Sequence, residues 1–266
     1  MIIKNAVLIT FSLAFLCQNG MTQEKAFSFP DEYTIAASDP LGHFYLVNED
    51  QLIKSGKKGD YLFTFSDPGL GNITWIDPSD PFRILVYYRS FNQLVFLDRT
   101  LSPIADPVSL DETDIFSPAG ICRSSQGGVW LIDEINSSIV KLNSKLEKTV
   151  NTRFSGISTG SNNRWLPMIE WKERLYICIP DSTIIQYDLF GTRIKNIPAR
   201  AESFGFSGLS LLFTGSHGAY SYTGFGIPEG PEKLIDLDYE NLIISGDIGL
   251  AKDKKGWQLY HLKKTF

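Results

Sequence analysis

The sequence predicts an all-β protein, a six-bladed β-propeller closed by an N-terminal strand that joins the last blade. Short β-rich runs recur as hairpins, Gly and Pro interrupt the chain every ten residues or so, and no long segment has a helical period. The second strands of the repeat are centred 40, 45, 46, 35 and 38 residues apart, at Tyr45, Leu85, Trp130, Tyr176, Leu211 and Gly249. Propeller blades of four strands have this period.

The predicted elements follow the chain as four strands per unit. Four clear hairpins form the second and third strands, at 43–47 with 51–54, 83–88 with 93–97, 129–133 with 138–142, and 174–178 with 183–187. Earlier strands are expected at 33–37, 72–76, 120–123 and 168–171, and later ones at 61–65, 147–153, 193–197 and 233–237. The fifth and sixth units align without a gap, 202–223 against 240–261.

The ends of the chain predict how the ring closes. The sixth unit supplies only three strands before Phe266, whereas residues 25–30 form a spare strand ahead of the first unit. If that segment becomes the outer strand of the last blade, no three-stranded blade with an open edge remains. A β-sandwich also has short strands and frequent turns, but it does not require a four-stranded repeat.

Composition limits the classes of partner. The chain has 266 residues, 43% of them hydrophobic, which is ample for a packed core, and its formal net charge is −5. A nucleic-acid-binding protein would carry a basic face, so nucleic acid is not an expected partner. Polybasic attachment to a membrane is disfavoured for the same reason.

The first 22 residues are interpreted as a signal peptide, followed by the propeller at 23–266. Lys4 gives the positive start, and Ala6 to Cys17 form an apolar run of 12 residues, too short to span a bilayer. Gly20 and Thr22 lie at −3 and −1 of a cut before Gln23. We therefore expect an exported protein in the periplasm or associated with the outer membrane, without a transmembrane segment.

One of the three cysteines is a candidate lipidation site. Cys17 ends the apolar run, where a lipoprotein would be acylated, although Leu16 stands where a small residue is usual, so ordinary cleavage is favoured over a lipid anchor. Cys122 and Cys178 lie far apart among apolar strand residues, and both are expected to be buried free thiols.

One repeat carries a family resemblance. The third unit resembles an NHL-type propeller repeat at Pro118-Ala-Gly-Ile121, Gly127-Gly-Val-Trp-Leu131, Asp133, Asn136 and Ile139-Val-Lys-Leu142. Residues 39–47 are similar to the turn and second strand of the same repeat. The third strands that end at Asp98, Asn143 and Asp188 add to a likeness to exported propellers of Bacteroidota envelopes. The resemblance covers the fold and implies no site. Units five and six depart from the pattern at 224–226 and 247–249.

No catalytic or metal-binding motif emerges, and no cofactor is expected. His43, His217 and His261 are separated by the repeat, whereas zinc needs three or four converging ligands. The acidic loops 77–80 and 111–114 are candidate calcium loops, yet neither has a recognised ligand spacing, and solvated turns are the simpler interpretation. Gly-x-Ser-x-Gly is absent.

A candidate binding surface comes from the predicted topology. Loops between second and third strands emerge on the same face as the connections between blades. The candidate binding surface on that face consists of Arg89, Phe91, Asp114, Arg164 and Trp165. Arg, Phe and Trp are among the residues enriched at protein interfaces. The alternative is that Phe91 and Trp165 only pack between the sheets.

The functional expectation is a non-enzymatic interaction module of the cell envelope. It would serve as a scaffold or accessory subunit for an envelope protein, such as a part of an outer-membrane secretion or assembly machine. The alternative is an enzyme or binding protein for a carbohydrate or small ligand in the central channel, where Glu170 is the one acidic residue of the predicted inner strands. A lectin-like ring ranks last, because the aromatic residues do not repeat from blade to blade.

Overall fold

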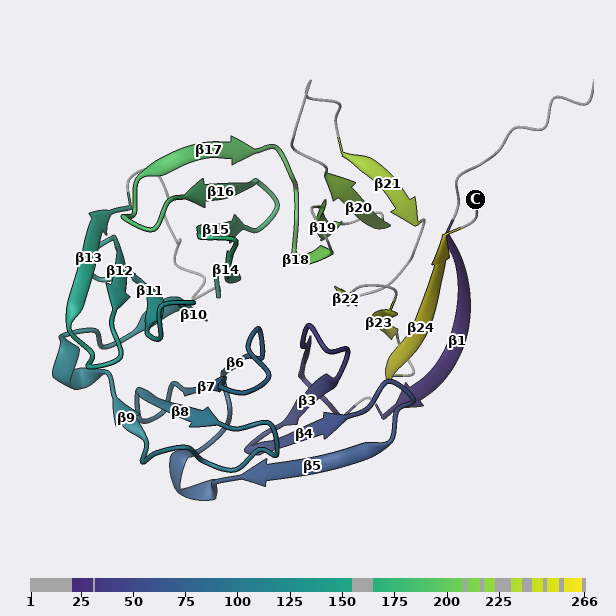
Figure 1. Ribbon diagram of the computed structural model, residues 1–266, viewed down its shortest axis with the longest axis horizontal. Coiled ribbons are helices and arrows are strands. Elements are labelled where there is room, and N and C mark those ends of the chain that lie inside the picture. The colour runs from purple at the N-terminus through teal and green to yellow at the C-terminus, as the bar shows by residue number, and fades with distance from the viewer. Residues whose placement is uncertain are drawn as a thin grey trace, which may run out of the picture.

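Six small sheets stand in a ring around a central axis, with one edge strand of each sheet nearest the axis and the other at the rim (Figure 1). The computed structural model describes residues 21–30, 32–154, 165–207, 210–215, 218–222, 231–235, 241–245, 248–253 and 256–264. Within these residues, 24 strands form six four-stranded antiparallel sheets. The predicted six-bladed propeller is confirmed. Among the described residues, no helix has the length and apolar character needed to cross a bilayer.

The first three blades follow the chain in order. Blade 1 contains β2 (Ile35–Ser38), β3 (Phe44–Asn48), β4 (Gln51–Ser55) and β5 (Tyr61–Ser66). Blade 2 contains β6 (Trp75–Asp77), β7 (Ile84–Tyr88), β8 (Gln93–Leu97) and β9 (Val108–Ser109). Blade 3 contains β10 (Pro118–Arg123), β11 (Val129–Asp133), β12 (Ser138–Leu142) and β13 (Lys148–Arg153). Two 3-10 turns, η1 (Pro68–Leu70) and η2 (Asp111–Thr113), lie in the connections on either side of blade 2.

The other three blades complete the ring. Blade 4 contains β14 (Met168–Trp171), β15 (Arg174–Ile179), β16 (Thr183–Tyr187) and β17 (Arg193–Ile197). Blade 5 contains β18 (Ser203–Ser207), β19 (Ser210–Gly215), β20 (Gly218–Tyr222) and β21 (Glu232–Ile235). Blade 6 contains β22 (Asn241–Ser245), β23 (Ile248–Asp253), β24 (Gly256–Lys264) and, from the other end of the chain, β1 (Met21–Phe29).

The two ends of the chain close the ring, as predicted. The strand β1 pairs antiparallel with β24, from Met21 opposite Lys264 to Phe29 opposite Trp257, and the two run side by side at the rim (Figure 1). Phe29 and Trp257 are buried, and the Trp257 indole donates to the Tyr33 carbonyl of blade 1 at 3.0 Å. Cleavage before Gln23, still a prediction, would leave most of this strand in place.

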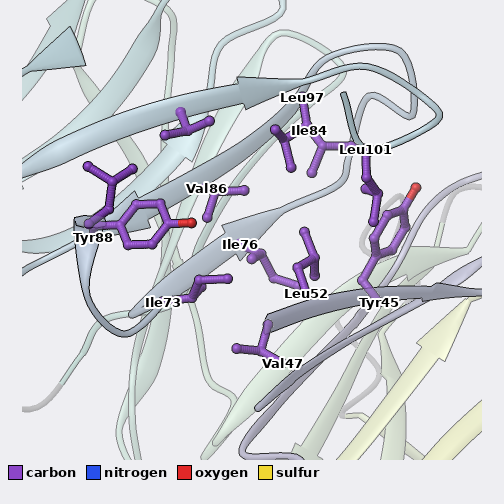
Figure 2. Packing of buried hydrophobic residues seen from close by; sticks show 12 residues of the cluster. Tyr45, Val47, Leu52, Ile73, Ile76, Ile84, Val86, Tyr88, Leu97 and Leu101 are labelled. Atoms are coloured by element: carbon purple, nitrogen blue, oxygen red, sulfur yellow. The ribbon is translucent and has the colours of Figure 1, made fainter. Parts of the chain in front are cut away.

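The core lies in the seams between blades. One apolar cluster joins blades 1 and 2, where Tyr45, Val47 and Leu52 face Ile76 and Val86 (Figure 2). Similar clusters fill the seams between blades 2 and 3, 3 and 4, 4 and 5, and 6 and 1. The second strands of blades 2, 3 and 4 are therefore buried on both sides, which explains continuous apolar runs such as residues 84–88.

The hairpin turns repeat one device. At the end of the third strand of blades 2, 3 and 4, the side chain of Asp98, Asn143 or Asp188 accepts hydrogen bonds from the backbone N–H groups two and four residues later, at 2.7–3.0 Å. The short polar side chain thus closes each turn. The recurrence of Asp or Asn in the sequence has this structural cause.

Two strand predictions need correction. The segment predicted as 72–76 becomes β6 at Trp75–Asp77, because residues 73 and 74 bond to the Glu49 and Tyr87 carbonyls before the ladder begins. Asp77 is consequently a second acidic residue on an inner strand, in addition to Glu170 of blade 4. No outer strand was predicted for blade 2, where β9 has only two residues; Pro103 and Pro107 interrupt this stretch and supply no N–H donor.

Candidate functional site

The site lies on the face that carries the crossovers between blades. Because neighbouring strands alternate in direction, the loop between the second and third strands opens on the same side as each crossover. We call this side the crossover face and the opposite side the hairpin face. Arg89 and Phe91 lie in the loop between β7 and β8, Asp114 in the crossover from blade 2 to blade 3, and Trp165 at the end of the next crossover.

An aromatic cluster with one arginine forms where Trp165 reaches back across blade 3 to blade 2. The Trp165 ring packs against Trp75, with centroids 5.4 Å apart, and stacks on Tyr87 at 5.8 Å with an interplanar angle of 24°. The Arg89 guanidinium carbon lies 5.5 Å from the Trp165 ring centroid. We call Trp75, Tyr87, Arg89 and Trp165 the Trp-Arg cluster.

This part of the molecule concentrates unpaired polar atoms. Of eight buried side-chain nitrogen and oxygen atoms that lack a hydrogen-bond partner among the described residues, three belong to the cluster: the indole nitrogens of Trp75 and Trp165 and Nε of Arg89. A buried donor without a partner costs about 1–3 kcal/mol, so such groups are uncommon in native proteins and each needs an explanation.

The base of the cluster is held firmly. The Tyr87 hydroxyl donates to Oδ1 of Asn92 at 3.1 Å, and the Asn92 amide donates to Asp111 at 2.6 Å and to the Ile115 carbonyl at 2.7 Å. Burial raises the pKa of Tyr87 to about 12, although the nearby Arg89 charge opposes the shift. Tyr87 is therefore a neutral phenol at any physiological pH, and the loop that carries Arg89 is tied to the neighbouring crossover.

Exposed apolar side chains lie on the same face as the cluster. Phe91 is 54% exposed, Phe116 in the crossover between blades 2 and 3 is 57% exposed, and Ile135 in the loop between β11 and β12 is 67% exposed. All three lie on the crossover face of two adjacent blades. Large apolar side chains around half-buried aromatic residues are typical of a surface that binds a protein.

The five predicted surface residues have different outcomes. Arg89 and Trp165 come together in the Trp-Arg cluster, Phe91 is exposed beside it, and Asp114 is exposed on the neighbouring crossover. Arg164 lies outside the described residues. Four members of the surface were not predicted from the sequence: Trp75, Tyr87, Phe116 and Ile135. The antiparallel pairing of β6 with β7, which places Trp75 opposite Tyr87, was the signal that could have found the first two.

Glu170, the candidate channel acid, holds two blades together. Its carboxylate accepts from the Ser124 hydroxyl at 2.8 Å, the Ser125 N–H at 3.0 Å, the Ser125 hydroxyl, and the Trp130 indole at 2.6 Å, all from blade 3. Burial alone would raise its pKa, but these hydrogen bonds outweigh burial and lower it. A carboxylate kept ionised by four donors is poorly suited to act as a general acid.

The other acidic loops and one histidine also have structural roles. Asp77 accepts from the Arg123 N–H at 2.7 Å, and Asp80 pairs with the Arg123 guanidinium at 3.2 Å, which joins blades 2 and 3. His43 bonds to buried Asp39 at 2.9 Å in the first hairpin turn. Within the described residues, no group of three or more His, Cys, Asp or Glu side chains could hold a metal ion. His217 lies outside them.

Comparisons with known proteins show the fold. A streptogramin B lyase structure matches with 13% identity and a TM-score of 0.60, over 92% of this chain and 88% of that one. BBS1N in complex with ARL6DN matches with 12% identity and a TM-score of 0.56, over 88% and 79%. The Pan2 WD40 domain of Neurospora crassa matches with 8% identity and a TM-score of 0.57, over 84% and 73%.

At these identities the three likenesses establish a shared propeller architecture alone. No protein-family model matches the sequence, and no curated protein matches it either. The resemblance to NHL-type repeats therefore stays a prediction. The class that fold and site define is a six-bladed β-propeller with an aromatic and apolar surface on its crossover face.

Proposed function

We propose that this protein is a non-enzymatic interaction propeller of the bacterial cell envelope, and that it binds a protein partner through the crossover face of blades 2 and 3. The observation that carries the proposal is that one face of blades 2 and 3 carries both the Trp-Arg cluster and the exposed side chains of Phe91, Phe116 and Ile135. Interface energy usually concentrates in a few Trp, Tyr and Arg residues surrounded by apolar contacts that exclude water.

The roles of the polar residues support the same conclusion. Glu170 and Asp77, the acidic residues of the inner strands at the seams described above, are engaged in bonds between blades. The crossover face, in contrast, carries buried donors that make no bond within the described chain. One of the structural neighbours is itself a propeller seen in a complex, which is a precedent for the architecture.

The envelope location rests on the N-terminal sequence. Lys4 and the apolar run that ends at Cys17 support export, and the NHL-like repeats support a relation to exported propellers of Bacteroidota. The protein would act in the periplasm or at the outer membrane, as a scaffold or accessory subunit of a secretion or assembly machine. Acylation of Cys17 would add a lipid anchor.

Affinity purification from gently solubilised envelopes tests the proposal. The wild type is compared with a variant in which Arg89, Phe91 and Trp165 are alanine, and co-purifying proteins are identified by mass spectrometry. A matched control replaces Phe82, Arg99 and Phe190 on the hairpin face, all of them exposed. Thermal melting establishes that both variants fold.

The expected result is a stoichiometric envelope protein that co-purifies with the wild type and with the control variant but is lost from the crossover-face variant. Equal recovery of the envelope protein with both variants would show that the partner binds to another part of the propeller. If nothing co-purifies with an exported, folded wild type, a stable scaffold is ruled out, and a screen of carbohydrates and small ligands against the central channel becomes the next experiment.

A further inference from the structure

The unpaired donors of the Trp-Arg cluster share one chemical property. The indole nitrogens of Trp75 and Trp165 and Nε of Arg89 can only donate hydrogen bonds, and none has an acceptor among the described residues. The groups that carry them lie within 6 Å of the Trp165 ring centroid. The partner that each of these atoms lacks is therefore a hydrogen-bond acceptor.

From this arrangement we infer that the Trp-Arg cluster is a recognition site for a single carboxylate, carried by an acidic side chain of the partner protein. The inference rests on the proposed function and specifies the chemistry of its contact. A carboxylate accepts several hydrogen bonds and carries no donor when ionised, so it matches a set of indole and guanidinium N–H groups. Arg89 supplies the opposite charge.

Charge in the surroundings favours a singly charged ligand. Asp111 and Asp114 lie on the adjacent crossover, and Asp111 accepts from Asn92 directly below the cluster. One guanidinium among these acids compensates one negative charge, whereas a phosphate with about two charges would be repelled. Phe91 and Phe116 are exposed on the same face as the cluster, so the carboxylate is expected among apolar residues of a protein segment.

Access to the cluster is from the crossover face. Trp75, Arg89 and Trp165 are each partly exposed, although the three nitrogen atoms are covered. Arg89 has the longest and most flexible side chain of the three. Movement of this side chain is the step that we expect to open the three nitrogen atoms to a carboxylate.

The experiment records the indole N–H signals of the ¹⁵N-labelled protein by NMR. The probe is N-acetyl-glutamate N′-methylamide, which has one side-chain carboxylate, and the matched neutral probe is the glutamine analogue. Signals are assigned by single Trp→Phe substitutions. Trp130 and Trp257 serve as internal references, because their indoles already donate to Glu170 and to the Tyr33 carbonyl.

The expected result is a saturable shift of the Trp75 and Trp165 signals with the glutamate probe, at least tenfold weaker with the glutamine probe, while Trp130 and Trp257 do not move. Arg89→Gln should weaken binding at least tenfold, which corresponds to about 1.4 kcal/mol. Arg99→Gln, an exposed arginine on the hairpin face of the same blade, should bind as the wild type. Unchanged reference signals show that Arg89→Gln folds.

Three outcomes would overturn the carboxylate site: no saturable shift, equal shifts with both probes, or a stronger response to inorganic phosphate. Each of them leaves the protein-binding proposal standing if an envelope partner is still lost from the crossover-face variant. Conversely, a carboxylate-dependent shift without any envelope partner would retain the site and remove the scaffold function. The two proposals therefore fail separately.

Discussion

Removal of the Glu170 carboxylate should weaken the seam between blades 3 and 4. In Glu170→Ala the Trp130 indole, which is fully buried, loses its acceptor at 2.6 Å, and Ser124 and Ser125 lose theirs. An unpaired buried donor costs about 1–3 kcal/mol, and a hydrogen bond to a charged group contributes about 1.5–3 kcal/mol. Since these bonds share one acceptor and do not add, we expect a loss of about 3 kcal/mol.

Thermal unfolding provides the assay for this loss. For a chain of this size, about 3 kcal/mol corresponds to a decrease in Tm of about 6–12 °C. Glu112→Ala serves as the control, because Glu112 is exposed in η2 and its removal should change stability by less than about 0.5 kcal/mol. If Glu170→Ala melts at the same temperature as Glu112→Ala, the carboxylate does not stabilise the seam and the argument fails.

The same network predicts the pH dependence of stability. The pKa of Glu170 is lowered below its ordinary value of 4.5 in the folded protein, so its contribution is complete above 4.5 and is lost as the pH falls through the lowered pKa. The stability difference between the wild type and Glu170→Gln should therefore be largest near neutral pH and shrink in acid. A difference that grows on acidification would contradict the assignment of an ionised carboxylate.

Three further predictions concern other parts of the ring. Phe29→Ala in the closing strand should cost about 3–5 kcal/mol by chemical denaturation, because Phe29 is 1% exposed, and wild-type stability would show that β1 does not close the ring. Gly128→Ala should destabilise severely, since an added Cβ would lie 1.8 Å from the Leu142 carbonyl oxygen, while exposed Gly69→Ala should melt as the wild type. The thiols of Cys122 and Cys178 should react with a thiol reagent only after denaturation, because both are buried and burial raises the pKa of Cys122; labelling of Cys122 or Cys178 in the native protein would refute this.

The repeat made the ring and its closure predictable. Hairpins can be recognised locally from turn residues such as Asp98 and Asn143 and from apolar runs such as 84–88. The second and third strands of blades 1 to 4 were therefore predicted almost to the residue. The strand β1 followed from counting, since a six-unit ring with three strands in its last unit needs one more. The short strand β9 was not predicted, because nearby prolines interrupt the alternating pattern of a strand and because its pairing with β8 is not visible in the local sequence.

The candidate site was only half predictable, for a different reason. Arg89 and Phe91 could be placed because a tight hairpin loop fixes its own face of the ring. Trp165 ends a long crossover, and nothing in the local sequence says that it reaches back to Trp75 and Tyr87 of blade 2. The role of Glu170 was hidden in the same way, because its donors come from the neighbouring blade. A sequence pattern that repeats within each unit does not predict which side chains will meet between units.

Photo-crosslinking in intact envelopes tests the central claim most directly. The crosslinking amino acid benzoylphenylalanine is placed at Phe116 on the crossover face or at Phe82 on the hairpin face, both exposed phenylalanines bordering blade 2. The account predicts that the probe at position 116 captures a discrete envelope protein and that the probe at position 82 does not. Capture of the same protein from position 82 alone would contradict the assignment of the crossover face as the binding surface.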